Sequence, residues 1–194
     1  MRRLSVLLAA TGWLVVPSGP AFAQLAGIPY GPTPTGTGFS LSADYGDPDP
    51  GSAWGLTGGL GLGKFGLLAG IGTWDGSGDD VTTFGAAGGL NVLNLGSVGV
   101  GAQFGVSIYD PGGGTRTDFL PGVHGRADIL GFPVKPWAVI YDAIRDGGDD
   151  EFRFTIGADL NVLPTLGVHA GYDWGDNSDT WGIGAHFKFS APVI

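Results

Sequence analysis

The stretch "EFRFTIGADLNVLPTLGVHAGYDWGD", residues 151–176, alternates between apolar and polar positions on both sides of a central "LPT". The apolar set is Phe152, Phe154, Ile156, Ala158, Leu160 and Val162 before this tripeptide, and Leu166, Val168, Ala170, Tyr172 and Trp174 after it. A period of two residues is typical of β-strands, so the stretch predicts a hairpin that turns at 163–165. The polar set is rich in glycine and isolated charges, which make a poor solvent-facing surface. The rest of the chain must therefore show which face is the inside.

The same alternation recurs along the chain and predicts about ten strands of roughly nine to eleven residues, without a convincing helical period. Outside the quoted stretch, the apolar faces are Phe39, Leu41, Ala43, Tyr45; Trp54, Leu56, Leu60, Leu62; Phe65, Leu67, Ala69, Ile71; Phe84, Ala86, Leu90, Val92; Val98, Val100, Ala102, Phe104, Val106, Ile108; Val123, Ala127, Ile129; Trp137, Val139, Tyr141; and Trp181, Ile183, Ala185, Phe187, Phe189. Around Pro136 the parity of the seventh strand stays open.

Two kinds of connection alternate between these strands. Short turns such as "LNLG" (93–96) and "LGFP" (130–133) are followed by longer acidic loops such as "DPGGGTRTD" (110–118) and "RDGGDDE" (145–151). Short turns at one end and longer loops at the other are typical of bacterial outer-membrane barrels.

Charge placement indicates which face meets lipid. Of the 18 acidic residues, thirteen fall in the long loops, and the other five fall on the polar strand face: Asp44, Asp128, Asp142, Asp159 and Asp173. In hydrocarbon every backbone polar group must be paired within the protein, so a spanning sheet has to close on itself. We therefore expect an all-β protein, a closed antiparallel up-and-down transmembrane β-barrel of about ten strands, with eight as the alternative.

Aromatic residues support this expectation, because many lie where strands meet the long loops, as in an interfacial belt. They are Tyr45, Trp54, Trp74, Phe84, Tyr109, Phe119, Tyr141, Phe152, Trp174 and Trp181. The alternative is a soluble sandwich with ordinary aromatic residues at its strand ends.

The N-terminal residues 1–23 predict a secretory signal peptide, because a basic start precedes an apolar run and an "AFA" cleavage site. An uncleaved anchor helix is the alternative. Residues 24–37 are rich in Pro and Gly and are expected to form a periplasmic lead-in, with an inserted plug as the alternative. The barrel is expected over 38–189, followed by a tail over 190–194. The chain has no cysteine, and its net charge of −9 argues against nucleic-acid binding.

The signal peptide, the series of hairpins and the ending "WGIGAHFKF" (181–189) resemble the small outer-membrane β-barrel family that includes the opacity proteins and the OmpA-like transmembrane domain. The last strand is similar to the C-terminal signal that the barrel assembly machinery reads in that family. The tail "SAPVI" departs from the pattern, since the family usually ends on the aromatic residue. The best-known members have eight strands, whereas the periodicity here predicts ten.

The lumen of such a barrel would be lined on its early strands mainly by glycine: Gly55, Gly59, Gly61, Gly66, Gly70, Gly72, Gly85, Gly89, Gly99, Gly101 and Gly105. Two interpretations stay open. The lumen is hollow on that side, or the glycines permit curvature and close packing of larger side chains opposite.

The later strands predict a lumen charge network of Asp44, Arg126, Asp128, Asp142, Arg153, Asp159, His169, Asp173, His186 and Lys188. Counting residues from the turns places Asp159 opposite His169, His169 opposite His186, and Asp142 opposite Arg153. Three functions are compatible with this cluster: a salt-bridged plug, a selectivity constriction in a small pore, or a hydrolase. The hydrolase is the weakest, because no nucleophilic serine accompanies the histidines.

We therefore expect a monomeric outer-membrane barrel, structural or forming a narrow, low-conductance pore, and not an enzyme. A surface adhesion protein acting through its acidic loops is the runner-up. The expected partners are outer-membrane lipid and lipopolysaccharide, and the assembly machinery during insertion. No cofactor is expected. The loop carboxylates are either solvated and mutually repelling, or bridged by Ca²⁺ or Mg²⁺.

Overall fold

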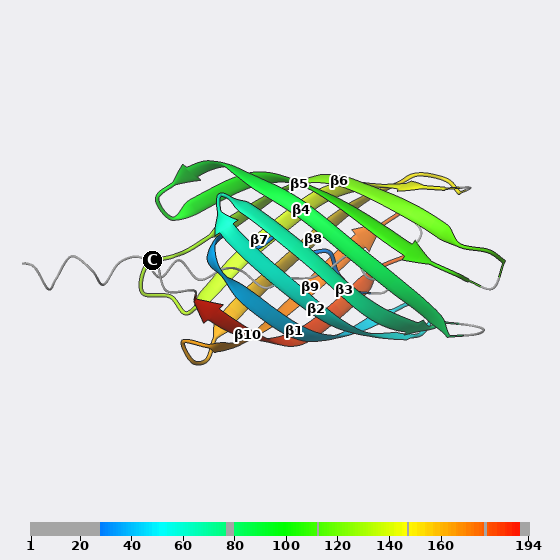
Figure 1. Cartoon of the computed structure of the whole chain (residues 1–194), viewed down its shortest axis with the longest axis horizontal. Helices are drawn as coiled ribbons and strands as arrows, with labels where there is room; N and C mark the ends of the chain where they lie inside the picture. The colour runs from blue at the N-terminus through cyan, green and yellow to red at the C-terminus, as the bar shows by residue number, and fades with distance from the viewer. Residues whose placement is uncertain (1–27, 77–79, 112, 147, 177, 191–194) are drawn as a thin grey trace, which may run out of the picture.

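Ten antiparallel strands form a closed barrel in the computed structural model (Figure 1). The structure describes residues 28–76, 80–111, 113–146, 148–176 and 178–190. The strands are β1 (Gly36–Pro48), β2 (Ser52–Gly63), β3 (Phe65–Asp75), β4 (Val81–Leu95), β5 (Val98–Tyr109), β6 (Arg116–Ala127), β7 (Val134–Arg145), β8 (Glu151–Asn161), β9 (Leu166–Gly175) and β10 (Thr180–Ser190). Among these residues no helix is long and apolar enough to cross a bilayer.

The connectivity is up-and-down, since each strand pairs with its neighbours in sequence. The first and last strands close the cylinder, with Gly38 opposite Ser190 and Pro48 opposite Thr180. Every strand therefore has a partner on both edges, and the wall presents no unpaired backbone edge. This confirms the predicted fold class, with ten strands and not the alternative eight.

The alternation of each strand sorts its residues between the outer surface and the lumen. In β5, Phe104 is 49% exposed on the outside while its neighbour Gln103 is 5% exposed inside. The same outward orientation holds for most large apolar residues of the other strands, for example Leu56, Leu67, Phe84 and Phe187. Leu68 of β3 and Leu120 of β6 are buried inside the barrel. The apolar set identified from the sequence thus points away from the protein interior, as predicted.

Strand β7 is the exception, because its faces are opposite to the predicted ones. Trp137, Val139 and Tyr141 are buried in the lumen, whereas Ile140 and Asp142 lie on the outer surface. Both parities of β7 are largely apolar, so the period of two does not distinguish its faces. The correction also removes Tyr141 from the predicted aromatic belt.

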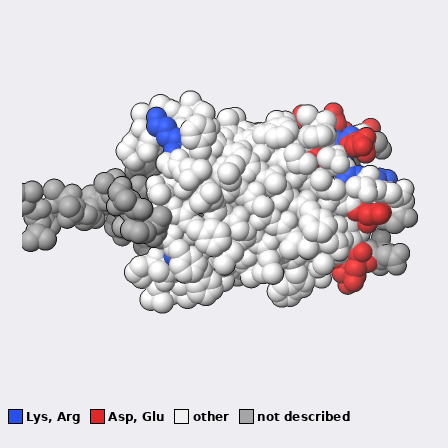
Figure 2. All heavy atoms as spheres, in the orientation of Figure 1, with Lys and Arg blue, Asp and Glu red and all other residues white. Residues whose placement is uncertain are grey.

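The two ends of the barrel differ in their connections and in charge. Short turns join β2 to β3 and β4 to β5 at one end, whereas the loops that follow β1, β3, β5, β7 and β9 lie at the other (Figure 1). Figure 2 shows acidic side chains gathered at this loop end and a broad middle belt without charged residues on the face shown.

The Pro- and Gly-rich stretch before β1 lies inside the barrel over the residues that the structure describes. Every residue from 28 to 35 is buried, and β1 begins at Gly36. The prediction of a periplasmic lead-in over 24–37 is therefore wrong for residues 28–35, which occupy the lumen. The predicted signal peptide (1–23) and residues 24–27 lie outside the described residues, as does most of the tail over 190–194.

Candidate functional site: the barrel lumen

Residues 28–35 form the central feature of the lumen and are called here the lumen segment. The side-chain amide of Gln103, on β5, pairs with the backbone of this segment. Its Oε1 accepts a hydrogen bond from the Thr33 N–H at 3.1 Å, and its Nε2 donates to the Gly31 carbonyl at 3.2 Å. One amide thus satisfies a donor and an acceptor that burial removes from water.

Tyr30 fixes the middle of the lumen segment. Its side chain is fully buried, and its ring meets Tyr141 of β7 edge to face with centroids 4.9 Å apart. Such pairs contribute about 0.5–1.5 kcal/mol beyond area burial. On the other side, Gly105 leaves room for the phenol, since a Cβ atom there would lie 2.9 Å from the Tyr30 hydroxyl oxygen.

The glycine-lined wall is filled by larger groups packed against it, which decides between the two interpretations of the lumen for these positions. A Cβ atom at Gly89 would collide with the Thr33 side chain, and one at Gly66 with the Pro34 backbone. On the later strands, Gly171 leaves room for Trp137, and a Cβ atom at Gly182 would lie 2.6 Å from Cδ of Pro29. At these positions glycine permits close approach of another group and does not leave open space.

The lumen segment follows the barrel axis from one end to the other. Pro29 lies beside Gly182 near the loop end, Tyr30 beside Gly105 at mid-height, and Pro34 beside Gly66 near the short turns. At about 3.1 Å per residue, eight extended residues reach roughly 25 Å, the height of the apolar band of an outer-membrane barrel.

Near the short-turn end, Arg126 of β6 contacts both the lumen segment and the wall. Its guanidinium donates to the Thr33 carbonyl at 3.4 Å and to Asn91 Oδ1 of β4 at 3.4 Å. His124 is 3.3 Å from the same oxygen of Asn91. A cation from the predicted network therefore holds the segment in place.

A second cluster joins β1, β9 and β10. Asp44 Oδ1 lies 2.6 Å from His169 Nε2, and the Nδ1 atoms of His169 and His186 are 3.0 Å apart with their rings stacked. Ser42 donates to the other oxygen of Asp44 at 2.9 Å. The expectation that no serine accompanies the histidines is therefore wrong, because Ser42 lies opposite His186 and bonds the carboxylate. All four side chains are buried.

The predicted pairings of this region are correct in one case and shifted in two. Asp159 does lie opposite His169. His169, however, lies opposite Gly184, so its contact with His186 is diagonal. Tyr141, and not Asp142, lies opposite Arg153, because the β7–β8 register differs from the predicted one by a single residue.

An ion-pair ladder, defined here as Asp118, Arg145, Glu151, Arg153 and Asp173, crosses β6 to β9 toward the loop end. Arg153 bonds Glu151 at 2.9 Å and Asp173 at 3.2 Å, and Glu151 also pairs with Arg145. Arg145 lies 4.0 Å from Asp118. The Tyr141 hydroxyl donates to Asp173 at 2.6 Å, so this ladder connects through Tyr141 to Tyr30.

Two members of the predicted network lie outside the lumen. Asp128 follows the end of β6, is exposed and pairs with Lys135 at 2.8 Å. Asp142 is exposed on the outer face of β7, as the one-residue register change requires. The remaining inward charges have partners: Trp137 donates to Asp159 at 3.1 Å, and Lys188 donates to Asn161 at 3.1 Å.

Several lumen residues are not evident from the sequence. The acidic composition of 145–151 places Glu151 in a loop, although it shares its parity with Arg153 and Thr155. Gln103 stands among inward glycines of β5, and this isolated amide was a usable signal. Tyr30 carries no periodic signal, because the segment around it has no regular alternation.

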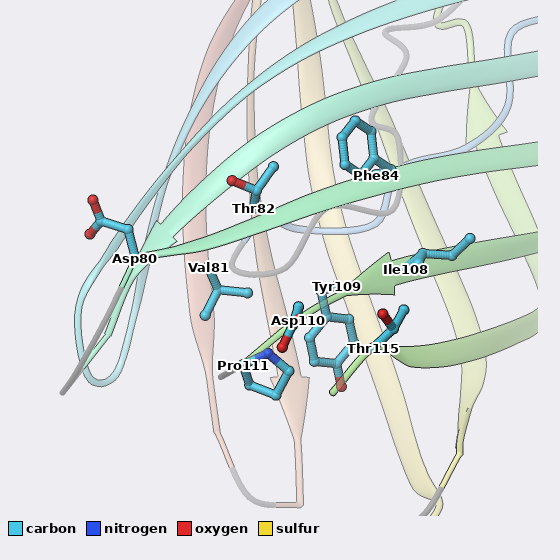
Figure 3. A pocket seen from close by; sticks show the side chains of 9 residues that line it. All are labelled: Asp80, Val81, Thr82, Phe84, Ile108, Tyr109, Asp110, Pro111 and Thr115. Carbon is cyan, nitrogen blue, oxygen red and sulfur yellow. The ribbon is translucent and has the colours of Figure 1, made fainter. Parts of the chain in front are cut away.

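Outside the lumen, a hollow of about 450 Å³ lies at the loop end where β4 begins and β5 ends (Figure 3). Phe84 and Ile108 line it from the outer face, and Asp80 and Asp110 border it. Within the described ranges no group of three or more His, Asp or Glu side chains is placed to hold a metal ion.

The barrel is similar to the KdgM porin. One KdgM structure, in complex with disordered oligogalacturonate, matches with a TM-score of 0.54 and 9% identity over 77% of this chain and 99% of that chain. A second KdgM structure matches with a TM-score of 0.51 and the same coverage. The Acinetobacter baumannii outer membrane protein Omp33 matches at 0.46, with 12% identity over 79% of this chain and 98% of that chain.

At these identities the likeness concerns the fold alone, which this chain shares with the KdgM outer-membrane barrel. No protein-family model matches the sequence, and no curated protein matches it significantly.

Proposed function

We propose that the chain is an integral outer-membrane protein with a narrow, porin-like passage and no enzymatic activity. The observation that supports this most directly is the closed barrel whose outer surface carries the large apolar side chains. A wall without backbone edges and with an apolar exterior satisfies the two requirements that a bilayer imposes on a spanning sheet. The resemblance to the opacity and OmpA-like barrels remains part of this proposal, with two more strands than their best-known members.

The lumen favours a low-conductance passage over a wide channel. Ten strands lie near the number at which side chains fill the interior. Here the lumen segment, the ion-pair ladder and the histidine cluster occupy it. The acidic loops would face the outside of the cell and the short turns the periplasm.

The histidine cluster does not support hydrolysis. A general base and a nucleophile must both reach a substrate. His169 is 2% exposed and Ser42 is 5% exposed, so neither side chain is accessible to a substrate in the passage. A surface-interaction role is the second candidate, because the loop end gathers acidic side chains (Figure 2).

Three measurements test the proposal. The protein should sediment with outer membranes, and its unheated form should migrate faster in detergent gels than the boiled form. Partition with soluble periplasmic proteins would overturn the membrane assignment. Small conductance steps in planar bilayers, from the full chain or from a variant without the lumen segment, would support the pore. If the membrane-inserted variants show no conductance steps, the surface-interaction role is supported instead of the pore.

A further inference from the structure

We propose that the lumen wall is a binding site for an extended, proline-rich peptide, and that the lumen segment is its resident, exchangeable ligand and the stopper of the passage. The stopper role rests on the proposed function, because it requires a conducting passage. The peptide site is argued separately, from the contacts between the wall and the segment.

The segment is suited to burial without secondary structure. Residues 28–35 read "IPYGPTPT", and the three prolines carry no backbone N–H. Fewer donors must therefore be satisfied when the segment leaves water. The structure assigns these residues neither helix nor strand.

The wall recognises the segment through a few specific contacts. The Gln103 amide forms hydrogen bonds with the backbone at Gly31 and Thr33, and Arg126 donates a hydrogen bond to the Thr33 carbonyl. Tyr141 receives the Tyr30 ring. Docking of a proline-rich chain in a groove lined by aromatic side chains is a general mode of peptide recognition.

The contacts also indicate that the ligand is exchangeable. Residues 28–35 carry no charged side chain, so no ion pair holds the segment to the wall. Its bonds to Gln103 and Arg126 described above are made by the backbone at Gly31 and Thr33. The charges of the wall are paired mainly with one another, in the ion-pair ladder and the histidine cluster. The wall can therefore keep its shape when the segment leaves.

Peptide binding in trans tests the site directly. In the test variant, residues 28–35 of the full chain are replaced by a Gly-Ser sequence of equal length, and folding is checked by gel mobility. A fluorescent peptide of sequence IPYGPTPT should bind this variant saturably and should bind the wild type much more weakly, because the resident segment competes for the site. Adding Gln103→Leu should weaken binding about tenfold or more, as the loss of a buried hydrogen-bonding pair requires. Absence of saturable binding to the folded variant, or equal binding to the wild type, would overturn the proposal.

A tether tests the stopper in the intact chain. The chain has no cysteine, so Thr33→Cys with Gly89→Cys introduces a single defined pair. A Cβ atom at Gly89 would lie 2.9 Å from Cβ of Thr33, which is shorter than the distance of about 3.5–4.5 Å in disulfides. The backbone at residues 33 and 89 must therefore move slightly apart for the bridge to form. In a Gln103→Leu background, the reduced form should conduct several-fold more than the oxidised form. The conductance of each single-cysteine variant should be the same with and without the oxidant.

The outcomes separate the two claims. Equal conductance in both redox states rejects the stopper while leaving the pore intact. Silence of every inserted variant rejects the pore, and peptide binding in trans then still decides the site.

Discussion

At the scale of single residues, burial decides which charged side chains contribute to the stability of the barrel. Glu151 is fully buried between two arginines, whereas Asp142 is exposed on the outer face of the neighbouring strand. Sequence parity predicted the inward direction of Arg153, Asp159, His169 and Asp173. The bond between Asp44 and His169 joins residues 125 apart through the closure of the barrel, and counting from a hairpin turn does not reach such a pair.

Replacing Glu151 by Gln should destabilise the barrel by about 3 kcal/mol, because two buried or half-buried arginines lose their common counter-charge. Asp142→Asn, the matched control on the outer face, should stay within about 0.5 kcal/mol of the wild type. Urea unfolding of the protein folded in vesicles, followed by tryptophan fluorescence, measures both. Equal effects of the two substitutions would contradict the assignment of the faces of β7 and β8.

At the scale of elements, the number of strands and the nature of the connections could be predicted because alternation and turn composition are local signals. The faces of β7 could not be predicted, because Ala138 and Ile140 are as apolar as Trp137 and Val139. Which of these residues point into the lumen depends on where other strands carry glycine, which leaves room for a large side chain. Trp137 fits over Gly157 and Gly171, and these residues are remote from it in the sequence.

Arginine at Ile140 tests this orientation. Ile140 lies at the middle of β7 and is 42% exposed on the outer surface, so Ile140→Arg should cost about 2–4 kcal/mol in a bilayer. Leu163→Arg, in the short turn after β8, should cost about 0–1 kcal/mol. Unfolding titrations in lipid vesicles compare the two. A tolerated arginine at 140 would indicate that this residue faces the lumen.

At the scale of the whole molecule, the two ends are chemically different. Acidic residues gather at the loop end (Figure 2), while Lys64 is exposed in the turn between β2 and β3 at the opposite end. The positions of the loops could be predicted from composition. The filled lumen could not, because a segment without periodicity carries no sign of the surface that will enclose it.

Trypsin treatment of intact cells should distinguish the two ends of the barrel. Arg116 is exposed beside the loop after β5, so cleavage there should occur from outside, while Lys64 should be cut only after the outer membrane is permeabilised. Mass spectrometry of the fragments distinguishes the two sites. Cleavage at Lys64 in sealed cells with Arg116 intact would reverse the proposed orientation.

The seam between β1 and β10 has a consequence for biogenesis. It joins residues that are 132 (Pro48 and Thr180) to 152 (Gly38 and Ser190) positions apart, so the cylinder is sealed only after the last strand has been translated and delivered. Ile28 to Thr35 immediately precede the first strand of that seam. They must therefore already lie on the concave side of the growing sheet when its margins zip together, or be drawn in afterwards through an opening. A nascent barrel that seals around an absent N-terminal stretch would be a distinct, empty species, and pulse-chase capture at the seam would reveal it.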